Sequence, residues 1–418
     1  MRIIFSGALF FLLAGSSSCI ELTYWPSSNP EEIKLAEILT AEWNKLHPDI
    51  TVRMQPLPAT QSSEEALLSA IVSKTTPDVC SNILPAIMGR FVKSGAVVAL
   101  DRFKDYKEVI YKRTGPRLAR TFHSRDGRIY QVPWKCNPVM LVYNTEIFES
   151  LGLKPPLTYG EFSEVAKTLT RDLNGDGRPD RWAMKVSIKN IWWQRLFDFY
   201  TFYVAASGGK TLLQNDKAAF NNGNAVRVMK FFREGFKNNF FPETGFSGDA
   251  FLDGKVGMDM AGPWAVKYYQ RLKPGFRFAF SRIPTPDRRE GPVYTYGDPK
   301  NIVIFSNTKY PVQSWEFVKF LISKEADRRL LEITNQMPMR QGLAGDAYFA
   351  DFFRKNPLLK KPAEQAAYVS PSDESVHLVQ ILDFISGQFE ASAVYGVISP
   401  EKSIEAAAAQ VQNIYDYW

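Results

Sequence analysis

Residues 132–153 read VPWKCNPVMLVYNTEIFESLGL, and the part LVYNTEIF predicts a strand that leads directly into a helix. The same alternation precedes this stretch. ELTYWP at 21–26 predicts a strand, the segment that begins at Asn29 and Pro30 predicts a capped helix, and TVRMQPLP predicts the next strand. NIVIFS at 301–306 repeats the strand pattern. Strands that alternate with helices indicate an α/β fold built on a parallel sheet with helices on both faces.

The size and the charge of the chain limit what it can be. Its 418 residues exceed the size at which one hydrophobic core usually stops growing, so two domains are expected. A formal net charge of +7 would suit an anionic partner, but the basic residues are spread out, without a tight Lys/Arg tract or a nucleic-acid motif. We therefore expect a solvated basic surface and no binding to nucleic acid.

Residues 1–18 predict a secretion signal. Arg2 precedes the apolar run IIFSGALFFLLAG, which is too short for a comfortable membrane span, and three serines follow. Small residues that lead directly into Cys19 resemble a bacterial lipoprotein signal, in which that cysteine is lipidated and becomes the first residue of the mature chain. Ser16 stands where that signal usually has leucine, so cleavage without lipidation stays open. We expect an exported protein, in the periplasm or on the outer face of the membrane.

The remaining cysteines and the histidines give little chemistry. Cys80 and Cys136 can pair in an exported protein, but their spacing does not show whether they come within bridging distance, so a disulfide and two buried thiols both stay open. His47, His123 and His377 are scattered, and the chain lacks the HExxH, GxSxG and GxxxxGK[ST] motifs. The sequence therefore predicts a binding protein and not an enzyme.

Several motifs in a fixed order resemble one family. The elements Pro133-Trp134, Tyr143-Asn144 and Gly152–Glu161 are similar to the part of family 1 extracellular solute-binding proteins where the chain crosses between lobes. That family is the maltodextrin-, trehalose- and glycerol-phosphate-binding group that serves ABC importers. FLDGKVGMDMAGPW at 251–264 and NQMPMR at 335–340 resemble later family elements in the same order. Each motif is weak alone, whereas the ordered set is specific and spans nearly the whole mature chain.

The resemblance implies a two-lobed periplasmic-binding-protein fold (type II), with lobes built from discontinuous segments around a ligand cleft. Residues 1–18 would be the signal peptide. Residues 19–139 and 300–345 would form the N-terminal lobe, and residues 140–299 and 346–418 the C-terminal lobe. Ligand binding would close the hinge between them.

The function implied by the resemblance is that of a monomeric substrate-binding protein, which needs no cofactor and delivers a small solute to ABC permease subunits in the membrane. A carbohydrate is the first expectation. Glycerol 3-phosphate or a glycerophosphodiester such as glycerophosphocholine is the alternative within the family. A secreted glycoside hydrolase and an adhesin-like lipoprotein are alternatives from other classes.

The aromatic candidates for ligand contact are tryptophans, because sugar C–H faces stack on aromatic rings. Trp264 follows Gly262-Pro263, a turn that would present the indole at a strand end, and Trp134 lies at the expected crossing between lobes. Trp192 and Trp193 are consecutive, so at most one is expected to meet a ligand, since adjacent helical residues do not share a face. The alternative for each is a place in the core.

The polar candidates would supply hydrogen bonds around that aromatic platform. They are Asn137, Tyr143, Asp259, Asn301 and Arg340. Arg340 matches an arginine common in the family, and it could bind a pair of sugar hydroxyls or, bidentately, a phosphate. The alternative for Arg340 is a salt bridge between segments.

A possible calcium loop lies outside these motifs. Asp172, Asn174, Asp176 and Asp180 occupy positions 1, 3, 5 and 9 of an EF-hand pattern, but position 12 is Ala183 instead of the bidentate glutamate. A weak structural calcium site and a tight turn that needs no metal are both compatible with this pattern.

Overall fold

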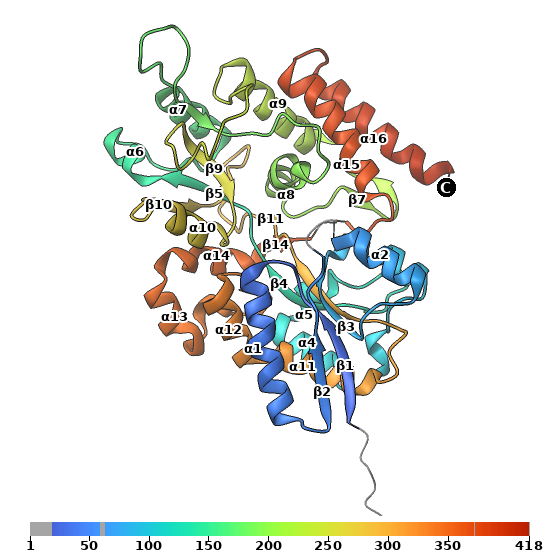
Figure 1. The fold of residues 1–418 in the computed structure, drawn as a ribbon. Coiled ribbons are helices and arrows are strands. Elements are labelled where there is room, and N and C mark those ends of the chain that lie inside the picture. Colours follow the sequence, from blue (N-terminus) through green and yellow to red (C-terminus); the bar gives the residue numbers. More distant parts are fainter. Residues whose placement is uncertain (1–18, 59–62, 372, 418) are drawn as a thin grey trace, which may run out of the picture.

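The computed structural model describes residues 19–58, 63–371 and 373–417. The chain forms two α/β lobes, each around its own sheet (Figure 1). We call the lobe with the six-stranded sheet the N-lobe and the lobe with the four-stranded sheet the C-lobe. The predicted signal peptide lies outside the described residues. Within the part of the chain that is described, no helix is long and apolar enough to cross a membrane.

The N-lobe sheet has the strand order β13-β4-β12-β3-β1-β2. Its strands are β1 Ile20–Trp25, β2 Ile50–Met54, β3 Val79–Ile83, β4 Val132–Cys136, β12 Lys300–Ile304 and β13 Met337–Pro338. Its main helices are α1 Pro30–Leu46, α2 Ser63–Ser73, α3 Met88–Lys93, α4 Tyr106–Thr114, α5 Pro116–Arg120, α11 Pro311–Leu321 and α12 Lys324–Thr334. The predicted cap of α1 is present, because the Asn29 side chain accepts hydrogen bonds from the backbone N–H groups of Glu31 and Glu32.

The C-lobe sheet has the strand order β10-β5-β9-β6. Its strands are β5 Met140–Asn144, β6 Trp182–Met184, β9 Val256–Ala261 and β10 Phe278–Ser281. The helices in this half are α6 Thr145–Ser150, α7 Tyr159–Leu169, the π-helical turn η3 Leu196–Tyr200, α8 Thr201–Ser207, α9 Gly223–Lys237 and α10 Ala265–Leu272. Of the later helices, α15 Leu378–Phe389 and α16 Pro400–Tyr417 pack with α9, whereas α13 Ala350–Lys355 and α14 Lys360–Gln365 lie beside α12 (Figure 1).

The expectation of a parallel sheet holds only in part, because both large sheets are mixed, although β6 also pairs with β9 in parallel. β1 is parallel to β2 and to β3, whereas β12 is antiparallel to both of its neighbours, and β5 is antiparallel to β9 and β10. The reason is that strands of one sheet come from segments separated by an excursion into the other lobe, so β12 enters its sheet from the opposite side.

The connections between the lobes lie side by side. β4 leads into β5 through residues 137–139, and the chain returns from β10 to β12 through β11 Thr295–Tyr296. The backbone N–H of Val139 donates to the Tyr296 carbonyl (2.9 Å), and β11 pairs in parallel with β14 Val369–Ser370. These bonds make one narrow junction between the lobes. The predicted residue boundaries of the lobes stay a prediction.

The cysteine alternatives are decided by the structure. Cys80 in β3 and Cys136 in β4 are buried and free. Burial raises the pKa of each thiol to about 12, because the charged thiolate would lose its hydration. The alternative of two unreactive buried thiols is therefore confirmed.

Candidate functional site

A hollow of about 480 Å³ opens in the C-lobe between η3 and the turn from β9 to α10. Its aromatic lining consists of Trp193, Phe197, Phe246 and Trp264. Its polar lining includes Lys185, Gln194, Asp198 and Asp259. Three of the residues predicted from the sequence, Trp264, Asp259 and Trp193, thus come together. As expected, only one of the two consecutive tryptophans borders the hollow.

Trp264 is held in place by the glycine two residues before it. The chain leaves β9 at Ala261, and the Gly262 carbonyl accepts the N–H of Ala265 (3.0 Å), so the turn folds the indole back over Gly262. A Cβ atom at Gly262 would lie 1.8 Å from the indole ring, a distance that only glycine avoids. The Gly-Pro-Trp sequence therefore fixes where this ring lies.

The rings in and behind the hollow contact one another edge to face. Phe197 packs against Trp264 with ring centroids 6.2 Å apart and against Tyr296 with centroids 5.7 Å apart. Trp193 packs against Phe197 at 6.3 Å. Since Tyr296 belongs to β11, this aromatic cluster reaches from the C-lobe to the junction between the lobes. Such a cluster offers an apolar face of the kind on which a sugar ring stacks.

Two aspartates give the hollow its polar character. Burial raises the pKa of Asp259 to about 7, although the ammonium of Lys185 opposes the shift. Burial likewise raises the pKa of Asp198 to about 6, opposed by the Arg195 guanidinium, which forms an ion pair with Asp198 at 2.9 Å. Carboxyl groups beside aromatic rings can bind the hydroxyl groups of a polar ligand.

Replacement of Asp259 by asparagine should change the pH dependence of stability. The folded-state pKa of Asp259 lies above its ordinary value, so the folded chain holds a proton that the unfolded chain releases, and stability falls as pH rises towards and past 7. The neutral amide of Asp259→Asn avoids this loss. We expect the variant to melt higher than the natural protein at pH 8 and at nearly the same temperature near the ordinary aspartate pKa of about 4. An equal offset at both pH values would show that Asp259 is charged throughout.

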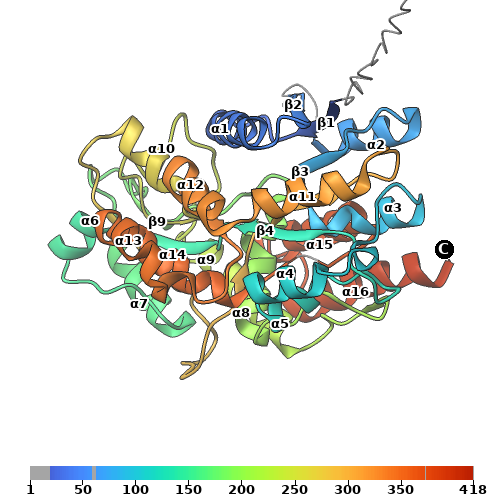
Figure 2. The same ribbon diagram turned by 90° about the horizontal axis from the view of Figure 1, so that it is seen from below.

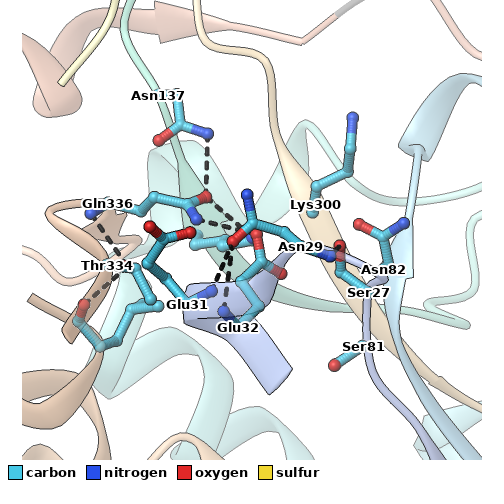
Figure 3. Close-up of polar contacts among 12 residues, drawn as sticks. Ser27, Asn29, Glu31, Glu32, Ser81, Asn82, Asn137, Lys300, Thr334 and Gln336 are labelled. Carbon is cyan, nitrogen blue, oxygen red and sulfur yellow. Dashed lines mark hydrogen bonds and ion pairs between the residues drawn. The ribbon is translucent and has the colours of Figure 1, made fainter. Parts of the chain in front are cut away.

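The N-lobe contributes a second set of polar side chains, drawn in part in Figure 3. We call it the polar group, and its members are Glu32, Lys135, Asn137, Asp298, Lys300 and Gln336. They come from the first turn of α1, from β4 and the residues just after it, from the start of β12, and from the link between α12 and β13. Only Asn137 among them was predicted. The sequence around Lys135 could have indicated a buried polar cluster, because a lysine inside the apolar strand VPWKC needs a buried partner.

Hydrogen bonds join the members of the polar group. The Lys135 ammonium forms an ion pair with Glu32 at 2.5 Å and donates to Gln336 Oε1 at 2.8 Å. The Gln336 amide donates to Glu32 Oε1 at 2.8 Å, and Asn137 Nδ2 donates to Gln336 Oε1 at 3.1 Å. Lys300 forms an ion pair with Asp298 at 3.2 Å. The charges therefore occur as neighbouring pairs of opposite sign.

Helix α10 ties the hollow to the N-lobe. Lys267, one turn after Trp264, donates to the backbone carbonyls of Glu332 and Ile333 in the last turn of α12. Figure 2 shows α10 beside α12. Because α12 runs directly into Gln336, this contact connects the aromatic wall with the polar group. Lys267 thus joins the helix that follows the aromatic lining to the helix that precedes Gln336.

Several predicted residues lie elsewhere, for clear reasons. Trp134 is only 4% exposed and belongs to the same N-lobe core cluster as Trp315. Asn301 is enclosed within the N-lobe sheet, where its amide donates to Gln131 Oε1 at 2.9 Å. Both side chains are used inside the N-lobe, which does not favour contact with a ligand, and the ligand-binding role of Trp134 and Asn301 stays a prediction.

Three further predicted residues also contact partners within the protein. Arg340 forms an ion pair with the fully buried Asp327 at 2.8 Å, so the salt-bridge alternative is the correct one. Tyr143 packs against Phe148 with ring centroids 4.8 Å apart, and Trp192 packs against the C-lobe core cluster. Neither Tyr143 nor Trp192 lines the hollow.

The predicted calcium loop is a set of turns that its own side chains stabilise. Asp172 accepts the N–H groups of Gly175 and Gly177, and Asp180 accepts those of Leu173 and Asn174. These hydrogen bonds use the oxygens that a cation would need. Within residues 19–58, 63–371 and 373–417, no three His, Cys, Asp or Glu side chains gather as a metal site. The turn is held without a metal by these bonds, and the weak calcium site stays a prediction.

Comparisons with known proteins agree with this architecture. Residues 28–328 match the family model of the bacterial extracellular solute-binding proteins. A putative binding protein of Brucella abortus is 24% identical over 391 residues, which are 88% of this chain and 86% of that protein. The sn-glycerol-3-phosphate-binding periplasmic protein UgpB of Agrobacterium fabrum is 23% identical over 407 residues, covering 92% of this chain and 90% of UgpB.

Solved structures share the fold along nearly the full length. An uncharacterized protein of Listeria monocytogenes has a TM-score of 0.85 and 26% identity, covering 94% of this chain and 99% of that one. The sugar-binding protein MalE of Xanthomonas citri has a TM-score of 0.80 and 20% identity, covering 95% of this chain and 97% of MalE.

Proposed function

The chain belongs to the bacterial extracellular solute-binding proteins, the solute-capturing components of ABC importers, and we propose that its solute is a neutral carbohydrate held between the lobes. The observation that carries this proposal is the hollow whose lining combines aromatic rings with carboxyl and amide groups. A sugar ring stacks its C–H face on Trp264, while its hydroxyl groups bind carboxyl and amide groups such as Asp259 and Gln194.

The balance of charge supports a neutral ligand. The buried Lys135 faces Glu32, Lys300 faces Asp298, and in the C-lobe Arg195 faces Asp198. Each of these cations already has a carboxylate within 3.2 Å, so none is reserved for an anion. A neutral polyhydroxyl ligand can be placed among such pairs without leaving a charge uncompensated.

A glycerol phosphate is the second candidate. It is favoured by the relatives named as sn-glycerol-3-phosphate-binding proteins and by Lys185 and Lys189, which line the hollow. Against it stands Arg340, the residue expected to bind the phosphate, because its guanidinium is held by Asp327.

The chain acts in this proposal as an exported binding protein without enzymatic activity, and its named relatives are likewise binding proteins. It delivers its ligand, as a monomer, to permease subunits in the membrane. Cys19 is exposed immediately before β1, a position that suits a lipid anchor. The intact mass of the protein extracted from membranes checks the anchor, since an unmodified mass would contradict it.

A thermal-shift screen of residues 20–418 tests the ligand class. The probes are maltotriose, trehalose, sn-glycerol 3-phosphate and glycerophosphocholine. A ligand that binds only the folded chain raises the melting temperature, and the stabilisation grows with the logarithm of its concentration. We expect a shift with at least one of the sugars. A shift with the phosphate compounds alone would transfer the proposal to the second candidate.

A further inference from the structure

A separate hollow of about 420 Å³ lies where the C-lobe meets the junction between the lobes. It shares no lining residue with the aromatic hollow. Its walls come from the start of β5, the end of β10, the loop that follows β10, and helix α14, which contacts β10 (Figure 1). We call this space between β10 and α14 the junction hollow.

The junction hollow borders each of the segments that meet at the junction. Met140 starts β5 directly after the first crossing, Val293 comes two residues before β11, and Tyr368 directly precedes β14. Gln365 of α14 joins two of these segments, because its Nε2 donates to the Val293 carbonyl (2.8 Å) and to the Tyr368 carbonyl (3.4 Å). A ligand in this hollow would therefore contact the segments that connect the lobes.

Two cations line the junction hollow, and neither forms an ion pair with a carboxylate of the residues that the structure describes. Arg282 donates one long hydrogen bond from Nη1 to the Arg289 carbonyl (3.4 Å), and its buried Nε has no acceptor in that part of the chain. Lys361 donates to the Phe280 carbonyl at 3.1 Å. A buried N–H group without an acceptor is rare in folded proteins, since its lost hydration is not replaced. Arg282 therefore has hydrogen bonds to offer to a bound group.

The charges and the shape of the lining indicate what that group is. Glu364 is the carboxylate in the lining, so together with Arg282 and Lys361 it leaves one positive charge in excess. That excess matches a monoanion, whereas Glu364 would repel the second charge of a dianion. A guanidinium binds a carboxylate through two parallel hydrogen bonds. Leu157 and Tyr368 add an apolar wall, so the hollow suits a carboxylate that carries an apolar body.

We propose that the junction hollow is a second binding site, separate from the site of the transported solute, and that it takes an organic monocarboxylate with an apolar body. The carboxylate accepts hydrogen bonds from the Arg282 guanidinium, including the Nε that lacks an acceptor, and faces the Lys361 ammonium. The apolar body packs against Leu157 and Tyr368. The bound anion thereby contacts all the segments of the junction at once.

Isothermal titration of residues 20–418 with benzoate tests the chemical class of the ligand. Acetate lacks the apolar body, benzyl alcohol lacks the charge, and inorganic phosphate carries a second charge near pH 7. All four probes are compared at the same ionic strength, because salt screens the attraction. We expect benzoate to bind about tenfold or more tightly than each of the others. Phosphate or acetate that binds as tightly as benzoate would contradict the proposal, as would the absence of benzoate binding.

Arg282→Gln tests the position of the site. Loss of the paired hydrogen bonds should weaken benzoate binding about tenfold or more, while the fold loses only one long hydrogen bond to a backbone carbonyl. Arg178→Gln is the matched control, because it removes the same charge from an exposed position of the 172–180 loop, outside the hollow. It should bind benzoate like the natural chain. Equal losses in both variants would mean that benzoate responds only to net charge, and the site would be wrong.

Hydrogen exchange locates the bound anion on the natural chain and does not depend on any variant. Benzoate should slow amide exchange in peptides that cover residues 139–141, 291–297 and 361–370, which border or adjoin the hollow. Slowing confined to peptides around Trp264 would place benzoate in the aromatic hollow and overturn the proposal. The sugar screen has a separate readout, so the proposed function and this second site can fail independently.

Discussion

Gly262→Ala is expected to abolish most ligand binding, although it removes no atom that a ligand would contact. The added Cβ would lie 1.8 Å from the Trp264 indole, and approaches under 3.0 Å force a shift. The ring must then swing out of the hollow or the β9–α10 turn must distort. Central aromatic contacts of this kind are often worth 2 kcal/mol or more, so we expect a loss of about 30-fold or more, similar to that of Trp264→Ala.

Gly223→Ala provides the comparison for this variant. Gly223 lies in the same lobe at the start of α9, and a Cβ there meets nothing within 4 Å. This variant should bind like the natural protein. Affinity is measured by isothermal titration with a sugar that shifts the melting temperature. Natural affinity in Gly262→Ala, with a folded protein, would mean that Trp264 is not the platform on which the ligand stacks.

The features that the sequence predicted well are local ones. The Asn29 cap of α1 depends on residues at most three positions away, and the Gly262-Pro263-Trp264 turn depends on immediate neighbours. The expectation that at most one of Trp192 and Trp193 would border the hollow depends likewise on adjacent residues, which lie here in a turn. Such features were predictable because the interacting groups are adjacent in the chain.

The contacts that the sequence analysis did not identify join distant segments. Glu32 and Gln336 are 304 positions apart, and Arg113 and Asp327 are 214 positions apart, yet each pair is in direct contact. Arg340 was interpreted as a ligand residue because its partner Asp327 could not be recognised as buried. A charged residue at a motif position is therefore ambiguous. The same side chain can bind a ligand or form a salt bridge within the protein, depending on which residues of other segments lie next to it.

Asp327→Ala is expected to cost about 3–5 kcal/mol of unfolding free energy, because it leaves the buried Arg113 guanidinium and the part-buried Arg340 guanidinium without their counter-ion. Asp327 is fully buried and forms ion pairs with Arg113 at 2.6 Å and with Arg340 at 2.8 Å. Arg113 also donates to the carbonyls of Pro133 and Trp134, so its displacement would disturb the edge of the N-lobe sheet. Urea unfolding of the variant measures the loss.

An exposed ion pair shows by contrast why burial decides the size of this effect. Asp287 pairs with Arg227 at 3.0 Å, but 83% of the Asp287 side chain is accessible to solvent. Asp287→Ala should therefore cost about 1 kcal/mol or less, since water replaces the lost partner. Equal losses for Asp287→Ala and Asp327→Ala would contradict the assignment of Asp327 as the buried counter-ion of both arginines. A large loss confined to Asp327→Ala would show that the N-lobe needs the ion pairs of Asp327 for its stability. The Arg340 guanidinium would then be held by Asp327 instead of being free for a ligand.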